Sequence, residues 1–363
     1  MKRIILIGPF PDPLTGVSLA NKVVKEILEE SEGFKVDFIN TSFPVFQDKV
    51  GSFSLRKLFF FFKINLKALR LFKNDIVYIT PGQTFFGIAK YMLFILLSTL
   101  LNKELIIHVH GNFLGKQYDE LKGFKKKFFY YLISKFTKGI VLSESLKNNL
   151  SPFLDTSKIF IVENFAEDFL FKDLKKDINR NLQIVYLSNL MEEKGILYLL
   201  DALAVLEERN IIYKAKIAGN IDESLKEKIV TKINKLENTS YLGIVYKKEK
   251  KELLEWSNIF VLPTFYKMEG QPISILEALA TKNVVIATNH AGIKDVITSN
   301  VNGYLVKPKS VESIVKPLLF LKENRDKIKE IAELNFEYFK NNFTVQKFKN
   351  KIIEIINANT RVK

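Results

Sequence analysis

Cysteine is absent from the 363-residue chain, which excludes a disulfide scaffold, a thiolate metal site and a cysteine nucleophile. Histidine is scarce, so a histidine-rich metal centre is not expected; the three residues are His108, His110 and His290. Long apolar runs are also missing. The longest, residues 85–101, is interrupted by Lys90 and is short for a membrane span, so the sequence predicts no transmembrane helix.

The N-terminal segment lacks the features of a signal peptide. Two cationic residues precede only four aliphatic residues, Ile4 to Ile7, and glycine and prolines then interrupt the run. We therefore interpret this run as a buried strand that ends in a loop.

The overall composition is that of a globular protein. Hydrophobic residues make up 47% and charged residues 26% of the chain, which excludes a disordered or collagen-like chain. The length allows two domains, each with its own core. The net charge of +15 implies an anionic partner: nucleic acid, a phosphorylated substrate or an anionic membrane.

Short aliphatic strands alternate with helical patterns, which favours parallel sheets covered by helices on both faces. In the first half we expect strands near 3–8, 35–40, 75–80, 104–109, 139–143 and 158–162, and helices near 17–31, 55–73, 85–101, 121–136 and 144–150. In the second half we expect strands near 183–188, 213–218, 240–242, 258–262 and 284–287, and helices near 194–209, 222–237, 247–255, 271–281 and 310–323.

A polar stretch at 164–181 separates the two halves. The predicted fold class is therefore α/β, with two doubly wound, Rossmann-like domains that face a central cleft. The expected domains are 1–165 and 166–343. Ligands bind such sheets at the carboxyl ends of the strands.

The segment from Glu269 to Ala278 is the most specific motif. Pro272 is expected at the start of a helix, where free backbone N–H groups and the helix dipole suit a phosphate, and Gly270 permits close approach. Glu277 lies eight residues after Glu269, so two carboxylates can hold hydroxyl groups of one ligand. The alternative is that Glu269 is a loop charge and Glu277 a solvated helix residue.

Other candidate residues stand at predicted strand ends. Lys194 and Gly195 open a helix where the lysine can meet a phosphate. Gly16 lies in the first strand-to-helix loop and permits close approach to a phosphate, or serves a plain turn. His110 ends a strand at the expected ligand-binding edge, although a histidine in such a place is often structural.

Positive charge is concentrated in residues 56–138, which hold 15 Lys/Arg and 4 Asp/Glu. Two segments, 56–73 and 122–131, mix these cations with aromatic residues. Arg56, Lys63, Lys67 and Arg70 recur on one predicted helix face. Either these are ordinary helices that pack their apolar residues on the sheet, or they bind anionic lipid, which the excess of phenylalanine favours over nucleic acid.

Taken together, these motifs resemble glycosyltransferase family four, whose members have the GT-B fold. The resemblance covers most of the chain. It is carried by residues 9–17, 108–111, 162–165, 188–195, 269–277 and 292–306.

The resemblance implies a retaining transfer of a sugar from a nucleotide donor to an acceptor hydroxyl, with no metal or other cofactor. Domain 1–165 would bind the acceptor and 166–343 the nucleotide sugar, and a last helix, 344–363, would pack back on the first domain. The site residues carried over are Gly16, His110, Asn189, Lys194, Glu269, Gly270, Gln271, Pro272, Ile273 and Glu277.

The family resemblance also implies a role for most of these residues. Gly16 would approach the donor diphosphate, and Lys194 would hold it. Glu269 and the backbone of 270–273 would hold the sugar. Glu277 would hold the ribose, and His110 would line the reaction centre.

Three segments depart from the family pattern. Ser188-Asn189 replaces the usual Gly-Arg, which shifts charge neutralisation to Lys194 and the backbone. The N-terminal loop has one glycine, and Gly292 to Asp295 ends in aspartate rather than glutamate.

The expected role is assembly of cell-surface polysaccharide or a lipid-linked glycan. The expected location is cytoplasmic, at the inner face of the membrane. The expected partners are a nucleotide sugar, a glycan or lipid-linked acceptor and an anionic membrane, but no nucleic acid. The alternatives are a nucleotide-sugar epimerase of the same fold and a non-catalytic basic protein that binds membrane or nucleic acid.

Overall fold

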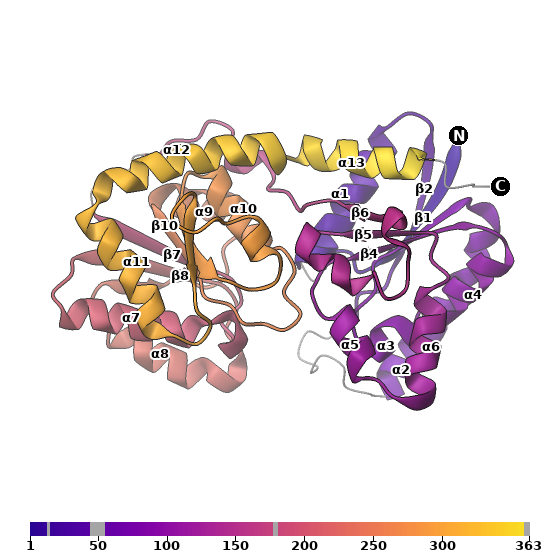
Figure 1. Cartoon of the computed structure of the whole chain (residues 1–363), viewed down its shortest axis with the longest axis horizontal. Coiled ribbons are helices and arrows are strands. Elements are labelled where there is room, and N and C mark those ends of the chain that lie inside the picture. Colours follow the sequence, from indigo (N-terminus) through magenta and orange to yellow (C-terminus); the bar gives the residue numbers. More distant parts are fainter. Residues whose placement is uncertain (13–14, 44–54, 177–180, 359–363) are drawn as a thin grey trace. The chain divides into compact units, whose positions relative to one another are not determined.

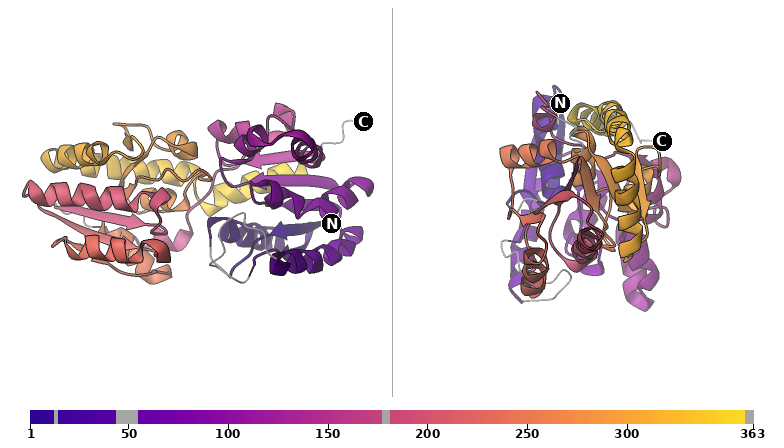
Figure 2. Two further views of the ribbon diagram at one scale, coloured as in Figure 1. Left: turned by 90° about the horizontal axis from the view of Figure 1, so that it is seen from below. Right: turned by 90° about the vertical axis from the view of Figure 1, so that its left-hand side faces the viewer.

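Two parallel six-stranded β-sheets, each covered by helices, form the cores of the structure (Figures 1 and 2). The computed structural model describes residues 1–12, 15–43, 55–176 and 181–358, and only the backbone of 55–58. The chain divides into two compact units. Unit 1 is Met1–Glu163 with Phe348–Lys363, and unit 2 is Asn164–Lys347. The predicted fold class, α/β with two Rossmann-like sheets, is confirmed.

The sheet of unit 1 has the strand order β2-β1-β3-β4-β5-β6, and all neighbours are parallel. Its strands are β1 (Lys2–Gly8), β2 (Phe34–Asn40), β3 (Ile76–Ile79), β4 (Glu104–Val109), β5 (Lys138–Val141) and β6 (Ile159–Ile161). The central β3 is buried along its whole length, as a strand covered on both faces must be.

The sheet of unit 2 has the order β12-β11-β10-β7-β8-β9 and is also parallel. Its strands are β7 (Leu182–Leu187), β8 (Tyr213–Ala218), β9 (Thr239–Tyr241), β10 (Ile259–Leu262), β11 (Val284–Thr288) and β12 (Gly303–Val306). The edge strand β12 is not among the expected elements. It is short and begins with Gly303, where an added Cβ would lie 2.5 Å from the Val285 carbonyl oxygen.

The helices of unit 1 are α1 (Gly16–Glu30), α2 (Leu55–Leu66), α3 (Phe85–Ala89), α4 (Met92–Leu100), α5 (Leu114–Glu120) and α6 (Gly123–Ile133). They differ from expectation in four places, one of which is α5, a helix that is not among the expected elements. The expected helix 55–73 continues from α2 as a 3-10 segment, η1 (Lys67–Lys73), and 144–150 is a 3-10 turn, η2 (Glu144–Asn149). The expected single helix 85–101 is broken at Lys90, whose carbonyl accepts a hydrogen bond from Asn65.

The helices of unit 2 are α7 (Ile196–Glu208), α8 (Lys226–Asn234), α9 (Lys247–Trp256), α10 (Ile273–Ala280), α11 (Val311–Glu323) and α12 (Arg325–Asn342). The expected helix 222–237 is shorter because it opens with a 3-10 turn at Glu223–Leu225. Helix α12 is not among the expected elements, although its buried Ile328, Ile331, Ala332 and Asn335 follow helical spacing.

The last helix, α13 (Val345–Asn357), is held by unit 1. The buried Lys138 donates to the carbonyls of Ile355 and Ala358, both at 2.6 Å, and pairs with Glu104 at 2.5 Å. Lys2 donates to the Ile356 carbonyl at 3.0 Å. These lysines supply the cationic donors that the C-terminal turn of a helix favours.

The units change at 163/164 and 347/348 rather than at the expected 165/166 and 343/344. Asn164 N donates to Gln271 Oε1 at 2.6 Å, which ties Asn164 to unit 2. A parallel backbone bridge between Ala166 and Thr344 likewise ties Thr344 to unit 2.

Candidate functional site

The site in unit 2 begins with the loop between β10 and α10. Pro272 is the N-cap of α10, with φ −62°, and no side chain caps this end of the helix. The first-turn N–H groups of α10 therefore have no side-chain acceptor, which suits an anion. Gly270 lies beside the 3-10 turn η7 (Ala291–Asp295), because its carbonyl accepts from Gly292 N at 3.0 Å.

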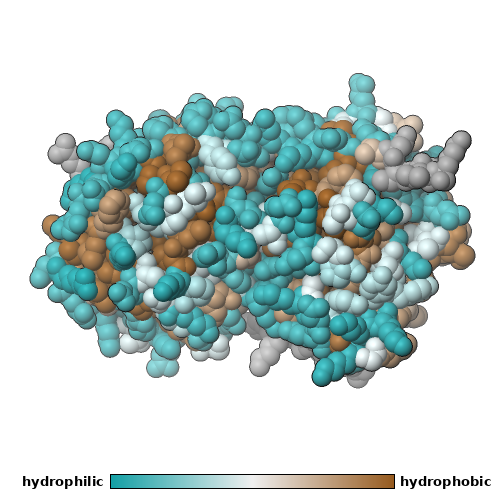
Figure 3. Space-filling view, in the orientation of Figure 1, coloured by the Kyte–Doolittle hydropathy of each residue, from teal (hydrophilic) through white to brown (hydrophobic). Residues whose placement is uncertain are grey.

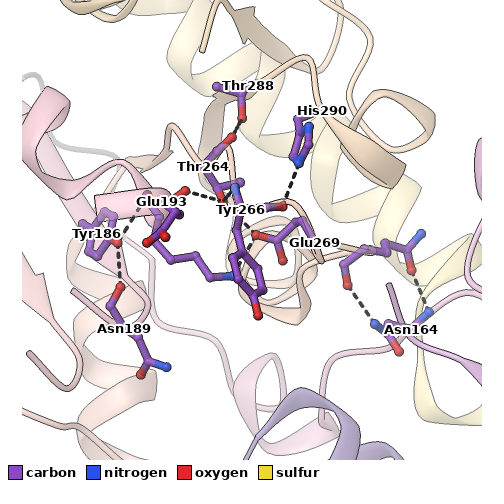
Figure 4. A network of polar contacts seen from close by, with 11 residues as sticks. Asn164, Tyr186, Asn189, Glu193, Thr264, Tyr266, Glu269, Thr288 and His290 are labelled. Carbon is purple, nitrogen blue, oxygen red and sulfur yellow. Dashed lines mark hydrogen bonds and ion pairs between the residues drawn. The ribbon is translucent and has the colours of Figure 1, made fainter. Parts of the chain in front are cut away.

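Lys194 and Glu269 form an ion pair at the centre of this loop. Lys194 Nζ lies 2.7 Å from Glu269 Oε2, and the Thr264 hydroxyl donates to the same oxygen at 2.9 Å. Glu269 is only 6% exposed, so this loop carboxylate is buried rather than solvated. Figure 4 shows Thr264 and Tyr266 beside Glu269. The Lys194 ammonium lies 5.1 Å from the centre of the Tyr266 ring.

The turn between β7 and α7 brings Lys194 to the loop. Gly195 has φ +81°, and an added Cβ would lie 2.2 Å from the Pro263 carbonyl oxygen, so only glycine fits. Phe265 N donates to the Glu193 carbonyl at 2.7 Å, which joins the two loops. Like α10, α7 begins without a side-chain cap.

Glu277, on α10, is paired with a lysine that the sequence analysis did not single out. Lys250 Nζ on α9 lies 2.6 Å from Glu277 Oε1, and Glu277 is 4% exposed. The solvated-residue alternative is therefore wrong. Burial opposes the charge on Lys250, but the Glu277 carboxylate prevails and raises the pKa of the lysine. The run of lysines in 247–251 conceals the partner in the sequence.

Asn164 fixes the loop from the other side. Its N–H donates to Gln271 Oε1 at 2.6 Å, and its Nδ2 donates to the Gln271 carbonyl at 2.7 Å (Figure 4). The side-chain oxygen and the backbone carbonyl of Gln271 are therefore both engaged within the protein. Asn189 is exposed, and its carbonyl accepts from the Tyr186 hydroxyl at 3.0 Å.

Gly16 and His110 lie in unit 1, at the carboxyl ends of β1 and β4. Gly16 is the exposed first residue of α1, whose N-cap is Thr15, and Thr15 and Ser18 form a capping box. The His110 ring centre lies 3.9 Å from that of His108, and His108 Nδ1 lies 2.5 Å from the Tyr78 hydroxyl. Burial lowers the pKa of His110 to about 3, so its imidazole is neutral at physiological pH.

The structure brings Lys194, Glu269 and residues 270–273 together. Glu277 lies further along, on helix α10. Gly16 and His110 belong to the other unit. In the described part of the chain, no three histidine or carboxylate side chains are grouped to hold a metal. A cation beside two uncapped helix ends can bind a phosphorylated ligand, and the carboxylates can accept bonds from its hydroxyl groups.

Comparisons with known proteins agree with this arrangement. Residues 167–337 match the family "Glycosyl transferases group 1". The chain is 27% identical over 155 residues to the amylovoran biosynthesis glycosyltransferase AmsK of Erwinia amylovora, covering 41% of this chain and 38% of AmsK. It is 25% identical to an uncharacterized glycosyltransferase of Haemophilus influenzae, covering 85% of both chains.

Two further comparisons concern an enzyme of stated activity and a solved structure. The UDP-Gal:alpha-D-GlcNAc-diphosphoundecaprenol alpha-1,3-galactosyltransferase of Escherichia coli is 25% identical over 197 residues, covering 50% of this chain and 49% of that enzyme. The structure of Anabaena Alr3699/HepE with UDP and glucose matches with a TM-score of 0.73 at 16% identity, covering 99% of this chain and 100% of the other, which shows the fold.

The epimerase and non-catalytic alternatives find no support in these relatives. The family match, the named relatives and the two parallel sheets lead to one assignment. Residues 167–337 form a domain of the group 1 glycosyltransferase family, and the chain has the GT-B fold.

Proposed function

We propose that the protein transfers a hexose from a UDP-sugar to a hydroxyl of a lipid-linked glycan, with retention at the anomeric carbon, during assembly of a polysaccharide. The donor proposal is supported by the UDP in the HepE structure and in the name of the Escherichia coli galactosyltransferase. The diphosphoundecaprenol in that name and the amylovoran role of AmsK support the acceptor and the pathway class.

The observation that carries the proposal is the Lys194–Glu269 pair beside the uncapped α7 and α10. In the transfer, the bond from the anomeric carbon to the diphosphate oxygen breaks and a bond to the acceptor oxygen forms. The proton of the acceptor hydroxyl passes to the departing diphosphate. Negative charge grows on the departing diphosphate, and Lys194 and the N–H groups of α10 stabilise it. We propose that this supply of positive charge makes a metal unnecessary.

The carboxylates position the donor. Glu269 would accept hydrogen bonds from hydroxyls of the sugar, together with the backbone of 270–273, and Glu277 would accept them from the ribose. Asn189 and Gly16 would line the diphosphate. His110, which is neutral, would face the reaction centre as a hydrogen-bonding group rather than as a cation.

The proposed location is the cytoplasmic face of the membrane, because a lipid-linked acceptor is held there. None of the helices in the described ranges is long and apolar enough to span a bilayer.

A donor screen tests the proposal. UDP-, GDP- and ADP-sugars are added to the purified protein with a chelator present, and the shift of the melting temperature and slow sugar hydrolysis are measured. We expect a UDP-sugar to raise the melting temperature and to be hydrolysed with the metal removed. Absence of any nucleotide-dependent shift would contradict the proposed donor, and a shift only with metal would contradict metal independence.

A further inference from the structure

One flank of unit 1 exposes an unusual number of aromatic side chains. Seven described phenylalanines are exposed in the whole chain, and five of them lie between residues 59 and 124: Phe59, Phe62, Phe72, Phe86 and Phe124. Phe59 is 68% exposed and Phe124 is 77% exposed. The same segments expose Leu66, Leu69, Leu93 and Leu100. Large apolar side chains gathered in this way mark a surface for a partner.

These segments are packed against one another. Lys90, between α3 and α4, lies with its ammonium 4.5 Å from the ring centre of Phe61 on α2. Phe85 on α3 lies 6.3 Å, ring centre to ring centre, from Phe128 on α6. The helices α2, α3 and α6 also lie together in Figure 1. The segments 59–73, 86–100 and 122–131 are therefore neighbours, and we call their exposed residues the basic aromatic surface.

The phenylalanine run is not the core-facing stripe of its helix. Ile64, Ala68 and Leu71 are buried at helical spacing and make that contact, whereas Phe59 and Phe62 face solvent. The alternative that the whole run is packed against the sheet is therefore wrong. Within the described parts of unit 1, no other segment covers the exposed rings of Phe59 and Phe62.

Cations surround the aromatic residues. Lys63, Lys67, Lys122 and Lys127 are exposed, and none has a carboxylate at ion-pair distance among the described residues. Arg70, expected on this face, is instead committed to Asp37 on β2, with its Nε 2.8 Å from the Asp37 carboxylate. The side chain of Arg56 lies outside the described residues. In Figure 3 the lower right, where α6 lies, shows hydrophilic side chains beside apolar ones.

From these contacts we infer that the basic aromatic surface docks on an anionic lipid bilayer. Unpaired lysines attract lipid phosphates, and phenylalanine and leucine side chains enter the interface between head groups and acyl chains. The exposed leucines distinguish lipid from single-stranded nucleic acid, because bases stack on aromatic rings and gain little from leucine. This docking extends the proposed function, which places the acceptor in a membrane, but donor binding does not depend on it.

Co-sedimentation with vesicles tests the inference. Vesicles of phosphatidylglycerol and phosphatidylcholine, and of phosphatidylcholine alone, are mixed with the full chain at low and high salt. We expect binding to the anionic vesicles that weakens as salt rises but retains an apolar part. Lys63→Glu, Lys67→Glu and Lys127→Glu together should lower binding at least 100-fold, because each lysine near an anionic surface contributes about fivefold.

Matched variants separate charge from apolar insertion. Lys228→Glu, Lys235→Glu and Lys329→Glu change the net charge equally in unit 2 and should bind nearly as the parent does. Phe59→Ala, Phe62→Ala and Phe124→Ala should remove the salt-resistant part. UDP affinity should stay within twofold of the parent in every variant, so loss of docking and loss of donor binding are distinguishable.

Several outcomes would overturn the inference. These are absence of vesicle binding by the parent, equal binding to neutral vesicles, or equal loss in the unit 2 control. Binding of RNA at physiological salt without vesicle binding, or a dimer that the phenylalanine substitutions dissociate, would assign the surface to a different partner.

Discussion

At the scale of single residues, the site is a set of charges that neutralise one another. Lys194 pairs with Glu269, and Lys250 with Glu277, at 2.7 and 2.6 Å. Each pair is nearly buried, so each has a cost in desolvation free energy. A donor with a diphosphate and hydroxyl groups can engage both members of such pairs.

The Lys194–Glu269 pair yields a prediction about stability. Lys194→Met alone should lower the free energy of unfolding by about 3 kcal/mol, because it leaves the buried Glu269 carboxylate unpaired. Adding Glu269→Gln should recover most of this loss without recovering transfer activity. Urea denaturation and turnover, measured on both variants, check this. Recovery of turnover together with stability would show that the pair is only structural.

Glu277 yields a prediction about the donor. Glu277→Gln should raise the Kd for a UDP-sugar by roughly tenfold, since a hydrogen bond to a charged group contributes about 1–3 kcal/mol. Glu330→Gln, which changes an exposed carboxylate on α12, is the control. Calorimetric titration measures both, and an unchanged Kd for Glu277→Gln would remove Glu277 from the ribose site.

His110 yields a prediction about pH. Its folded-state pKa of about 3 lies below the ordinary value of 6.5, so between these values the unfolded chain binds more protons than the folded one. Its contribution to stability is therefore complete above pH 6.5 and is lost as the pH falls toward 3. His110→Gln should flatten this part of the stability curve. The same acid slope in parent and variant would contradict the neutral, buried state.

At the scale of elements, the strands were predictable because buried parallel strands leave short aliphatic runs in the sequence. β12 was not, because its four residues pair only at the edge and begin with glycine. The structure also explains two residues of the sequence motifs, Gly195 and Asn302. Gly195 lets the loop after β7 approach the loop after β10 at Pro263. Asn302 donates to the Val296 carbonyl and accepts from Thr298 N, which holds the loop before β12.

The pairing of charges was less predictable than the elements. Lys250 and Glu277 are 27 residues apart on different helices, and nothing in either helix pattern joins them. Likewise, Arg70 shares a periodic face with Lys63 and Lys67, yet it turns to Asp37 on a neighbouring strand. Such contacts depend on tertiary packing, which a single sequence does not encode at fixed spacing.

Helix α13 yields a prediction at this scale. Lys138→Met should lower the free energy of unfolding by about 3–5 kcal/mol. The substitution leaves the Glu104 carboxylate without its ion-pair partner and removes the hydrogen-bond donor to the last carbonyls of α13. Lys349 lies on α13 and forms an ion pair at the surface with Glu30. Lys349→Met should change the free energy of unfolding by less than about 1 kcal/mol. Equal effects of the two substitutions would show that Lys138 does not anchor the helix.

At the scale of the whole molecule, the order of strands and helices predicted two parallel sheets, and the motifs predicted the family. Both are confirmed. Gly16 and His110 lie in unit 1, whereas Lys194, Glu269 and Glu277 lie in unit 2. We therefore propose that unit 2 binds the donor.

Titration of UDP into the parent and into Lys194→Met, with a chelator present, tests this proposal. We expect saturable binding by the parent and a Kd at least tenfold higher for the variant, because the proposed diphosphate site combines the lysine with the α10 N–H groups. Lys228→Met, a substitution on α8, should bind as the parent does. Equal affinity of the parent and Lys194→Met for UDP would show that Lys194 does not bind the diphosphate.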